Sequence, residues 1–227
     1  MSALRRGIFV TGTDTGVGKT LVSTALMRAL KSRGMKVAGM KPVASGSEPT
    51  AAGLRNEDAL ALMREQSVPF PYELVNPYTF APAIAPHIAA AQAGIAIDLQ
   101  TIVAAFELLQ ARSDRVIVEG AGGWHAPISA SAGMQELAVA LNIPVLLVVG
   151  LRLGCLNHAL LTARAVESSG LAVSGWVANR IDSTFPYWEE NVETLRRRLP
   201  APLLGIVEHQ AIPSVDAAAR ALEVDGL

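Results

Sequence analysis

The sequence is poor in cysteine and in net charge. Cys155 is the only cysteine among 227 residues, so no disulfide can form within the chain, and we expect a reducing compartment. Basic and acidic side chains nearly balance, at 19 and 20, and no basic block is present. Because nucleic acid and anionic membrane surfaces attract clustered positive charge, we expect neither as the main partner.

Long hydrophobic runs are also missing. The most apolar stretch, Ile143 to Leu151, contains Pro144 and is too short to span a bilayer. The first residues, Met1 to Arg6, carry positive charge but lack the long apolar core of a secretory signal. We therefore expect a soluble, cytoplasmic protein.

Several common catalytic motifs are absent from the sequence. The four histidines have no zinc spacing, and there is neither a Gly-x-Ser-x-Gly elbow nor a His-Glu-x-x-His helix. Cys155 opens a predicted helix, where a thiolate would be favoured, but a small buried packing residue is the simpler interpretation.

A phosphate-binding loop lies near the N-terminus. A short apolar strand, 7–12, leads into a glycine-rich turn and then a helix that opens at Lys19 and Thr20. In such loops backbone N–H groups surround the phosphates, the lysine reaches the β- and γ-phosphates, and the hydroxyl holds Mg²⁺. The first glycine, Gly12, stands one residue earlier than in the common motif. This spacing indicates a nucleotide site of a longer-loop subtype.

Strand and helix patterns alternate along the whole chain without a linker or a repeat. This alternation, with a length that suits one domain over 1–227, predicts an α/β, P-loop NTPase-like three-layer fold with a mostly parallel sheet. Further strands are predicted at 36–40, 115–118, 144–149, 173–178 and 203–206, and helices at 21–31, 56–63, 98–110, 133–141, 156–169, 187–198 and 215–222. The stretch 144–149 should be central. The segments 44–50 and 69–86 are predicted to be loops.

Ligands of parallel sheets gather at the carboxyl ends of the strands. Glu119 ends a strand of this kind and is a candidate Mg²⁺ ligand. Asp58, in the first turn of a helix, either binds the metal or compensates the helix dipole. Lys41 is either solvated or a second cation for a transferring phosphoryl group. The segments expected to converge are 11–20, 41–45, 119–124, 150–158 and 179–180.

Seven segments, in order over nearly the whole chain, resemble the dethiobiotin synthetase family. They are 11–15 with 17–20, 41–46, 56–60, 76–80, 118–124, 153–158 and 176–180. The resemblance implies an ATP-dependent ligase of biotin biosynthesis. Its substrates are 7,8-diaminononanoate (diaminopelargonate), CO₂ and MgATP. Its product is dethiobiotin, formed through a carbamate and a carbamic–phosphoric anhydride with release of ADP and phosphate.

The resemblance also implies roles for individual residues. Lys41 is the catalytic lysine, assisted by Lys19, and Ser45 contacts the diamine. The metal ligands are Thr20, Asp58 and Glu119. The implied nucleotide-binding set is Thr13, Asp14, Thr15, Gly16, Val17, Gly18, Lys19, Thr20, Leu21, Asp58, Glu119, Gly120, Ala121, Gly122, Asn179, Arg180 and Glu208.

In this family the substrate carboxylate lies at a helix N-terminus supplied by the partner subunit. The matching backbone amides here belong to Cys155, Leu156 and Asn157. The resemblance therefore implies a homodimer with the substrate site at its interface.

Two positions depart from the family pattern. Some family members have glutamate where this chain has Gly16, so any role of that carboxylate is absent here. The family often has a proline-containing strand end near the base, whereas this chain reads Ile206-Val207-Glu208-His209-Gln210. Nucleotide preference, for ATP, CTP or another nucleotide, therefore stays open.

Two other enzyme classes share parts of the pattern. A partitioning-type switch ATPase carries an extra lysine early in the loop, where this chain has Thr13, Asp14 and Thr15. An amidoligase of the cobyrinate-amide kind shares the longer loop but appends a glutaminase domain, for which 227 residues leave no space. A non-enzymatic interaction module gives no reason for Lys41, Glu119 and Asn179 to occupy strand ends.

Overall fold

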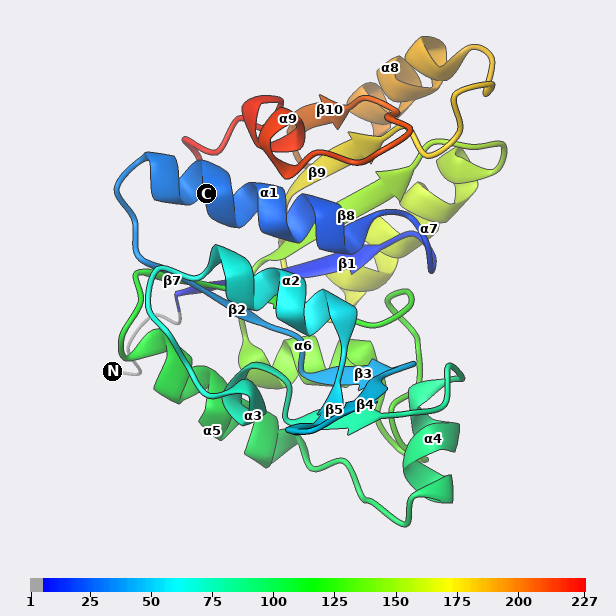
Figure 1. The fold of residues 1–227 in the computed structure, drawn as a ribbon. Helices are drawn as coiled ribbons and strands as arrows, with labels where there is room; N and C mark the ends of the chain where they lie inside the picture. The colour runs from blue at the N-terminus through cyan, green and yellow to red at the C-terminus, as the bar shows by residue number, and fades with distance from the viewer. Residues whose placement is uncertain (1–5) are drawn as a thin grey trace.

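The computed structural model describes residues 6–227 (Figure 1). Residues 1–5 lie outside the described part of the chain. The expectation about a secretory signal was based on Met1 to Arg6, so most of that segment also lies outside it. Within the described part of the chain, none of the helices combines the length and the apolar character needed to cross a membrane.

A six-stranded parallel sheet forms the centre of the structure. Its strands, in the spatial order β10-β9-β8-β1-β7-β2, are Leu203–Val207, Val173–Asn179, Val145–Gly150, Gly7–Gly12, Arg115–Glu119 and Val37–Met40. Every neighbouring pair in this sheet is parallel. The predicted α/β class is therefore confirmed. The interior position expected for β8 is also confirmed, because it pairs with β1 on one side and β9 on the other.

Helices cover both faces of this sheet, as the alternation of buried side chains along the strands requires. On β1, Ile8 and Val10 pack in one core with helices α1 and α9, whereas Phe9 lies in the core on the opposite face. Figure 1 shows α1 and α9 side by side on the first face. Outside the segment 69–92, the helices are α1 Lys19–Ser32, α2 Glu57–Glu65, α5 Leu99–Gln110, α6 Met134–Leu141, α7 Cys155–Ser168, α8 Trp188–Arg198 and the short α9 Val215–Arg220.

The segments 44–50 and 69–86 contain regular structure, so their prediction as loops was wrong. Strand β3 (Val43–Ser45) pairs with β6 (Tyr78–Phe80), and β4 (Glu48–Thr50) forms a hairpin with β5 (Gly53–Arg55). Short helices α3 (Tyr72–Val75) and α4 (Pro86–Gln92) flank β6. These strands are three residues long and lie among prolines, so they carry no periodic signal.

An ion-pair cluster joins α1 to α2. Arg28 of α1 donates from Nε to Glu65 Oε2 at 3.1 Å and pairs through its Nη2 with the other carboxylate oxygen. The Glu65 side chain is only 8% exposed, and Lys31 lies 3.5 Å from it. Because α1 begins at Lys19 and α2 carries Asp58 in its first turn, this cluster fixes the relative position of two parts of the candidate site.

Candidate nucleotide and substrate site

Glycines at two positions of the phosphate loop adopt left-handed backbone conformations. The φ angles are 74° at Gly16 and 87° at Gly18, which side chains with a Cβ rarely adopt. A Cβ on Gly18 would also lie 2.1 Å from Asn179 Nδ2. Glycine is therefore required at position 18 both by the conformation and by a close approach.

Asn179 at the end of β9 holds the loop in place. Its Nδ2 donates to the backbone carbonyl of Val17 at 2.8 Å, and the side chain is buried. A carbonyl acceptor fixes the amide orientation, because only the nitrogen end of the side chain can donate to it. The carbonyl of Asn179 in turn accepts from Leu151 N at 2.8 Å, so β9 also anchors the chain that leaves β8.

The first half of the loop is organised around Asp14. Its Oδ1 accepts from the N–H of Thr15 at 2.7 Å, and its Oδ2 pairs with Arg152, which follows β8. Its backbone carbonyl accepts from Lys19 Nζ at 3.0 Å. The pKa of the Asp14 carboxyl is held below its usual value, first by the Thr15 N–H and also by Arg152.

Three oxygen-bearing side chains meet at the start of α1. The hydroxyl oxygen of Thr20 lies 2.8 Å from Asp58 Oδ1 and 2.9 Å from Glu119 Oε1. A hydroxyl has one proton and can donate to only one of these carboxylates at a time. The structure therefore brings together all three predicted metal ligands, with more acceptors than donors among them.

This oxygen set suits Mg²⁺. The buried Glu119 Oε2 has no hydrogen-bond partner among the described residues, and Mg²⁺ prefers hard oxygen ligands. Residues 6–227 contain no cluster of three or more His, Cys, Asp or Glu side chains that could enclose a metal alone. Mg²⁺ is usually held by one or two carboxylates together with substrate phosphates.

Lys41, directly after β2, is buried beside the same carboxylates. Its Nζ lies 2.7 Å from Glu119 Oε1 and 2.8 Å from Asp58 Oδ2, and its side chain is 5% exposed. Burial alone would lower the pKa of Lys41, but the charges of Glu119 and Asp58 raise it above its ordinary value. The ammonium is therefore a fixed positive charge, and the interpretation of Lys41 as a solvated strand end is excluded.

Lys19 is the second cation of the site and behaves differently. Burial, reinforced by the positive charge of Lys41, lowers the pKa of Lys19 to about 8. An anion bound between the two ammonium groups would favour the charged form of both. The pair is thus prepared for a strongly anionic ligand.

Buried hydrogen bonds hold the backbone of Lys41. Asn76 Nδ2 donates to the Lys41 carbonyl at 2.6 Å and to the Tyr78 carbonyl at 3.1 Å. The Asn76 Oδ1 accepts from the Tyr72 hydroxyl at 2.8 Å, and that hydroxyl accepts from the N–H of Asn56, also at 2.8 Å. Asn56 caps α2 by accepting from Asp58 N and Ala59 N. The network therefore links Lys41 to the helix that carries Asp58.

Two cavities border the phosphate loop and share Gly16 and Gly18. The first, of about 370 Å³, holds both lysines and the metal-ligand cluster. The second, of about 270 Å³, lies toward β9 and β10. The first is lined by Thr15, Gly16, Gly18, Lys19, Thr20, Lys41, Ala44, Ser45, Asn56, Asp58, Glu119, Ala121 and Gly122. The second is lined by Gly16, Gly18, Leu21, Asn179, Arg180, Ile181, Glu208, His209, Gln210 and Pro213.

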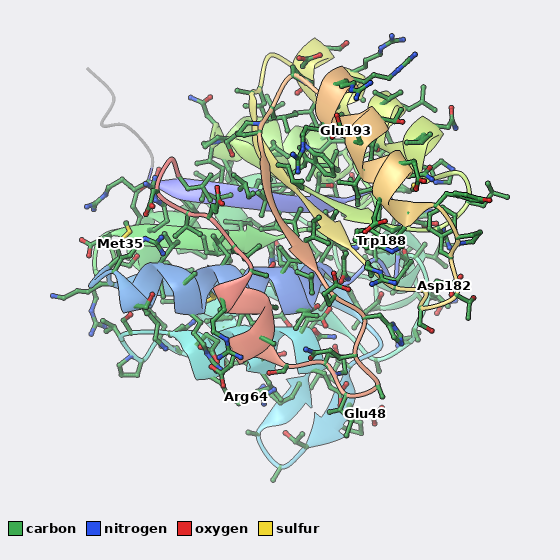
Figure 2. All side chains as sticks on the ribbon, turned by 90° about the horizontal axis from the view of Figure 1, so that it is seen from above. Met35, Glu48, Arg64, Asp182, Trp188 and Glu193 are labelled. Carbon is green, nitrogen blue, oxygen red and sulfur yellow. The ribbon has the colours of Figure 1, made fainter. Side chains whose placement is uncertain are left out.

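Arg180 forms the outer wall of the second cavity. Its guanidinium pairs with Glu208 and lies 4.4 Å from the centre of the Trp188 ring. Figure 2 shows Trp188 at the beginning of α8 and Asp182 in the loop before it. Arg180 and Glu208, both members of the predicted nucleotide-binding set, thus pair with each other in the lining of the second cavity.

Some predicted site residues line neither cavity. Thr13, Asp14 and Val17 shape the loop, and the carbonyl of Gly120 accepts from Lys41 Nζ at 3.3 Å. The three positions at the start of α7 also lie outside both cavities. Among them the Cys155 side chain is buried in the core beneath α7 and α8, and burial raises the pKa of its thiol. Packing therefore accounts for the Cys155 side chain, while the roles of the Cys155, Leu156 and Asn157 backbone amides stay predictions.

Several cavity residues were not predicted from sequence. Asn56 was predicted only as the first residue of a helix, and Ala44 only as part of the converging segment 41–45. Ile181, His209, Gln210 and Pro213 follow β9 and β10, and their position after strands was the available signal. No sequence pattern marks Arg152 or Asn76 for their contacts.

Comparison with known proteins extends over almost the whole chain. A family model described as an AAA domain matches residues 6–216. The ATP-dependent dethiobiotin synthetase BioD of Pseudomonas aeruginosa (strain UCBPP-PA14) is 51% identical, covering 92% of this chain and 93% of its own. The protein of the same name from Cellvibrio japonicus is 46% identical, covering 98% of both chains.

A solved structure supports the fold at much lower identity. The septum site-determining protein MinD from Pyrococcus horikoshii, complexed with Mg-ADP, matches with a TM-score of 0.59 and 16% identity. The match covers 96% of this chain and 86% of that one. At this identity the likeness shows the fold alone.

Proposed function

Because this chain belongs to the dethiobiotin synthetase family, we propose that it forms dethiobiotin from 7,8-diaminononanoate, CO₂ and ATP, releasing ADP and phosphate. The observation that carries this proposal is the position of Lys41. Its buried ammonium lies between Asp58 and Glu119 in the cavity that also holds Lys19 and the helix start of the phosphate loop. The site thus offers two cations and a metal-binding oxygen set to one phosphoryl group.

The reaction runs in three steps. One amine of the substrate forms an N–C bond to CO₂ and loses a proton, which gives a carbamate. A carbamate oxygen then attacks the γ-phosphorus and ADP leaves, so that a carbamic–phosphoric anhydride forms. The second amine attacks the anhydride carbonyl and loses a proton, phosphate leaves, and the cyclic urea closes.

The residues act by position and charge. Lys41 lies between carbamate and γ-phosphate and stabilises the negative charge that both bring, while Lys19 contacts the β- and γ-phosphates. Ser45, which lines the same cavity, contacts the diamine. Asn179 and Arg180, with Glu208, contact the base from the second cavity. Since both ammonium groups are buried, little water weakens these interactions.

Thr20, Asp58 and Glu119 would hold Mg²⁺ together with the nucleotide phosphates. A bound Mg²⁺ neutralises phosphate charge and favours attack at phosphorus. Supporting this assignment are the convergence of the three side chains and the unpartnered Glu119 Oε2.

The substrate carboxylate is bound, in this proposal, by the first-turn amides of α7 from a second copy of the chain. Helix N-terminal amides have no intrahelical acceptor and attract anions. Two observations favour a homodimer. The α7 start lies outside the substrate cavity of its own chain, and large apolar side chains are exposed just before α7 and in its middle, with Leu153 at 91% and Leu161 at 57%. The lone cysteine further favours a reducing, cytoplasmic location.

The test is an ADP-release assay with MgATP and bicarbonate, run with and without diaminopelargonate, with mass detection of the cyclic urea. We expect ADP release to require the diamine and to match dethiobiotin formed. Hydrolysis that ignores the diamine, with no urea product, would refute the proposal. In the same assay Lys41→Ala should lower turnover by about 10²- to 10³-fold while nucleotide binding persists.

The switch-ATPase alternative is not favoured. Its support is a fold likeness at 16% identity to MinD, whereas the synthetase relatives reach 51% over nearly full length.

A further inference from the structure

A carboxylate in a phosphate-binding loop is electrostatically unfavourable for an anionic ligand. Asp14 lies in the loop, one residue before Thr15, which lines the phosphate cavity. A charged Asp14 left unpaired would repel a triphosphate bound in the neighbouring cavity. The structure must therefore compensate its charge.

Arg152 supplies this compensation from outside the nucleotide cavities. Its Nη2 pairs with Asp14 Oδ2, while the other oxygen, Oδ1, accepts from Thr15 N at 2.7 Å. Both carboxylate oxygens are thus engaged, and Asp14 lines neither cavity. Lys19 also acts on Asp14, because its Nζ donates to the Asp14 carbonyl at 3.0 Å.

We propose that Arg152 is a positioning residue of the nucleotide site, which neutralises Asp14 and holds its carboxylate in the Thr15 turn, so that the loop accepts a triphosphate. Arg152 acts through Asp14 and does not touch the nucleotide. The inference rests on the proposed nucleotide site and assigns to this arginine a role that the family resemblance did not supply.

The exposed fractions of the Arg152 and Asp14 side chains distinguish a role in nucleotide binding from a role in folding stability. The Arg152 and Asp14 side chains are 43% and 47% exposed. Exposed ion pairs contribute little to folding stability, with a median of about 0–1 kcal/mol. Loss of Arg152 should therefore leave the protein folded while it changes the charge that a nucleotide meets.

The experiment is a double-mutant cycle on Mg²⁺-dependent binding of the non-hydrolysable analogue AMPPNP, measured by calorimetry. Arg152→Ala should raise the Kd about fivefold at low salt, an effect that shrinks as salt rises. The same change made in the Asp14→Asn background should alter the Kd less than about twofold, because no charge is left to neutralise. Arg152→Lys, which keeps the charge, should recover most of the affinity.

Arg164→Ala is the matched control, since Arg164 is an exposed arginine of α7 that lines neither nucleotide cavity. Its Kd should equal that of the wild type. An equal effect of Arg152→Ala in both Asp14 backgrounds would mean direct contact with the nucleotide and would overturn the proposal, as would no effect in either. A wild-type protein that binds no AMPPNP would instead refute the nucleotide site, and dethiobiotin formation tests the proposed function separately.

Discussion

The side chain of Asn76 holds the backbone of Lys41, with 2.6 Å between Asn76 Nδ2 and the Lys41 carbonyl oxygen. Asn76 is 2% exposed and also bonds to the Tyr72 hydroxyl. The position of the proposed catalytic ammonium thus depends on a side chain that does not line the cavity.

Asn76→Ala should reduce kcat more than it changes the KM for ATP. A shift of about 1 Å in a catalytic group can cost about 10²-fold in rate. The lost buried hydrogen bonds should also lower the free energy of unfolding by about 1–3 kcal/mol. Steady-state kinetics and denaturant unfolding measure the two effects.

Tyr72→Phe removes one hydroxyl from the same network and should give a smaller loss of kcat. Tyr78→Phe is its control, because that hydroxyl accepts from Asp98 N at 3.0 Å, at the start of α5. The control should leave turnover unchanged. If all three variants turned over substrate at the wild-type rate, the position of Lys41 would not depend on Asn76.

Asp58 and the adjacent Glu57 separate metal binding from helix-dipole compensation. Both are acidic residues in the first turn of α2, but Asp58 alone of the two lies beside Thr20 and Lys41. Glu57→Gln should cost only a few tenths of a kcal/mol of stability.

Asp58→Asn should raise the Mg²⁺ concentration needed for half-maximal turnover about tenfold. Substitution of groups that hold or orient a metal ion typically changes metal affinity by this order. A Mg²⁺ titration of the synthetase reaction measures it. Identical titration curves for Asp58→Asn and Glu57→Gln would show that Asp58 only compensates the helix dipole and does not bind the metal.

Gly18 and Gly34 allow a matched test of the phosphate loop. Their φ angles are similar, 87° and 82°, but a Cβ on Gly34 would meet no atom within 4 Å. Each alanine substitution should cost about 1–2 kcal/mol of stability for the left-handed conformation.

Only Gly18→Ala should also abolish AMPPNP binding, because its Cβ would displace the Asn179 side chain. Calorimetric titration of both variants provides the comparison. Nucleotide binding by Gly18→Ala at wild-type affinity would show that the contact between loop and β9 is dispensable.

Leu161 and Leu108 test the proposed homodimer. They are exposed to a similar extent, 57% and 55%, on α7 and α5 respectively. An aspartate buried in an apolar interface is unfavourable, so Leu161→Asp should dissociate the dimer and lower turnover together. Leu108→Asp should do neither. Sedimentation equilibrium gives the mass of each variant, and a monomeric wild-type protein with full activity would contradict the shared site.

The sequence predicted the main sheet because its strands are buried apolar runs that end in polar residues. Phe9 and Val118 belong to such runs, and Glu119 and Asn179 lie at strand ends where the rule for parallel sheets expects a ligand. The strand ends therefore identified most of the first cavity, but only Gly16, Gly18, Asn179 and Arg180 of the second.

Contacts between distant side chains were not predictable in the same way. Asn76 lies in a proline-rich segment whose short strand β6 has no periodic pattern, and its bond to Lys41 spans 35 positions. Arg152 is separated from Asp14 by 138 positions and is one of many arginines that are half-buried or exposed. Only the folded backbone brings such pairs together, and exposed charges give no hydrophobic signal.

The two cavities that share Gly16 and Gly18 set a length requirement on the ligand. A ligand that occupies both must bend around the loop, with its base beside Asn179 and its last phosphate beside Lys41. A nucleotide with a single phosphate should end short of Lys41. The position of the loop between the two cavities therefore selects nucleotides by their number of phosphates. We expect this selection to be independent of which base is bound.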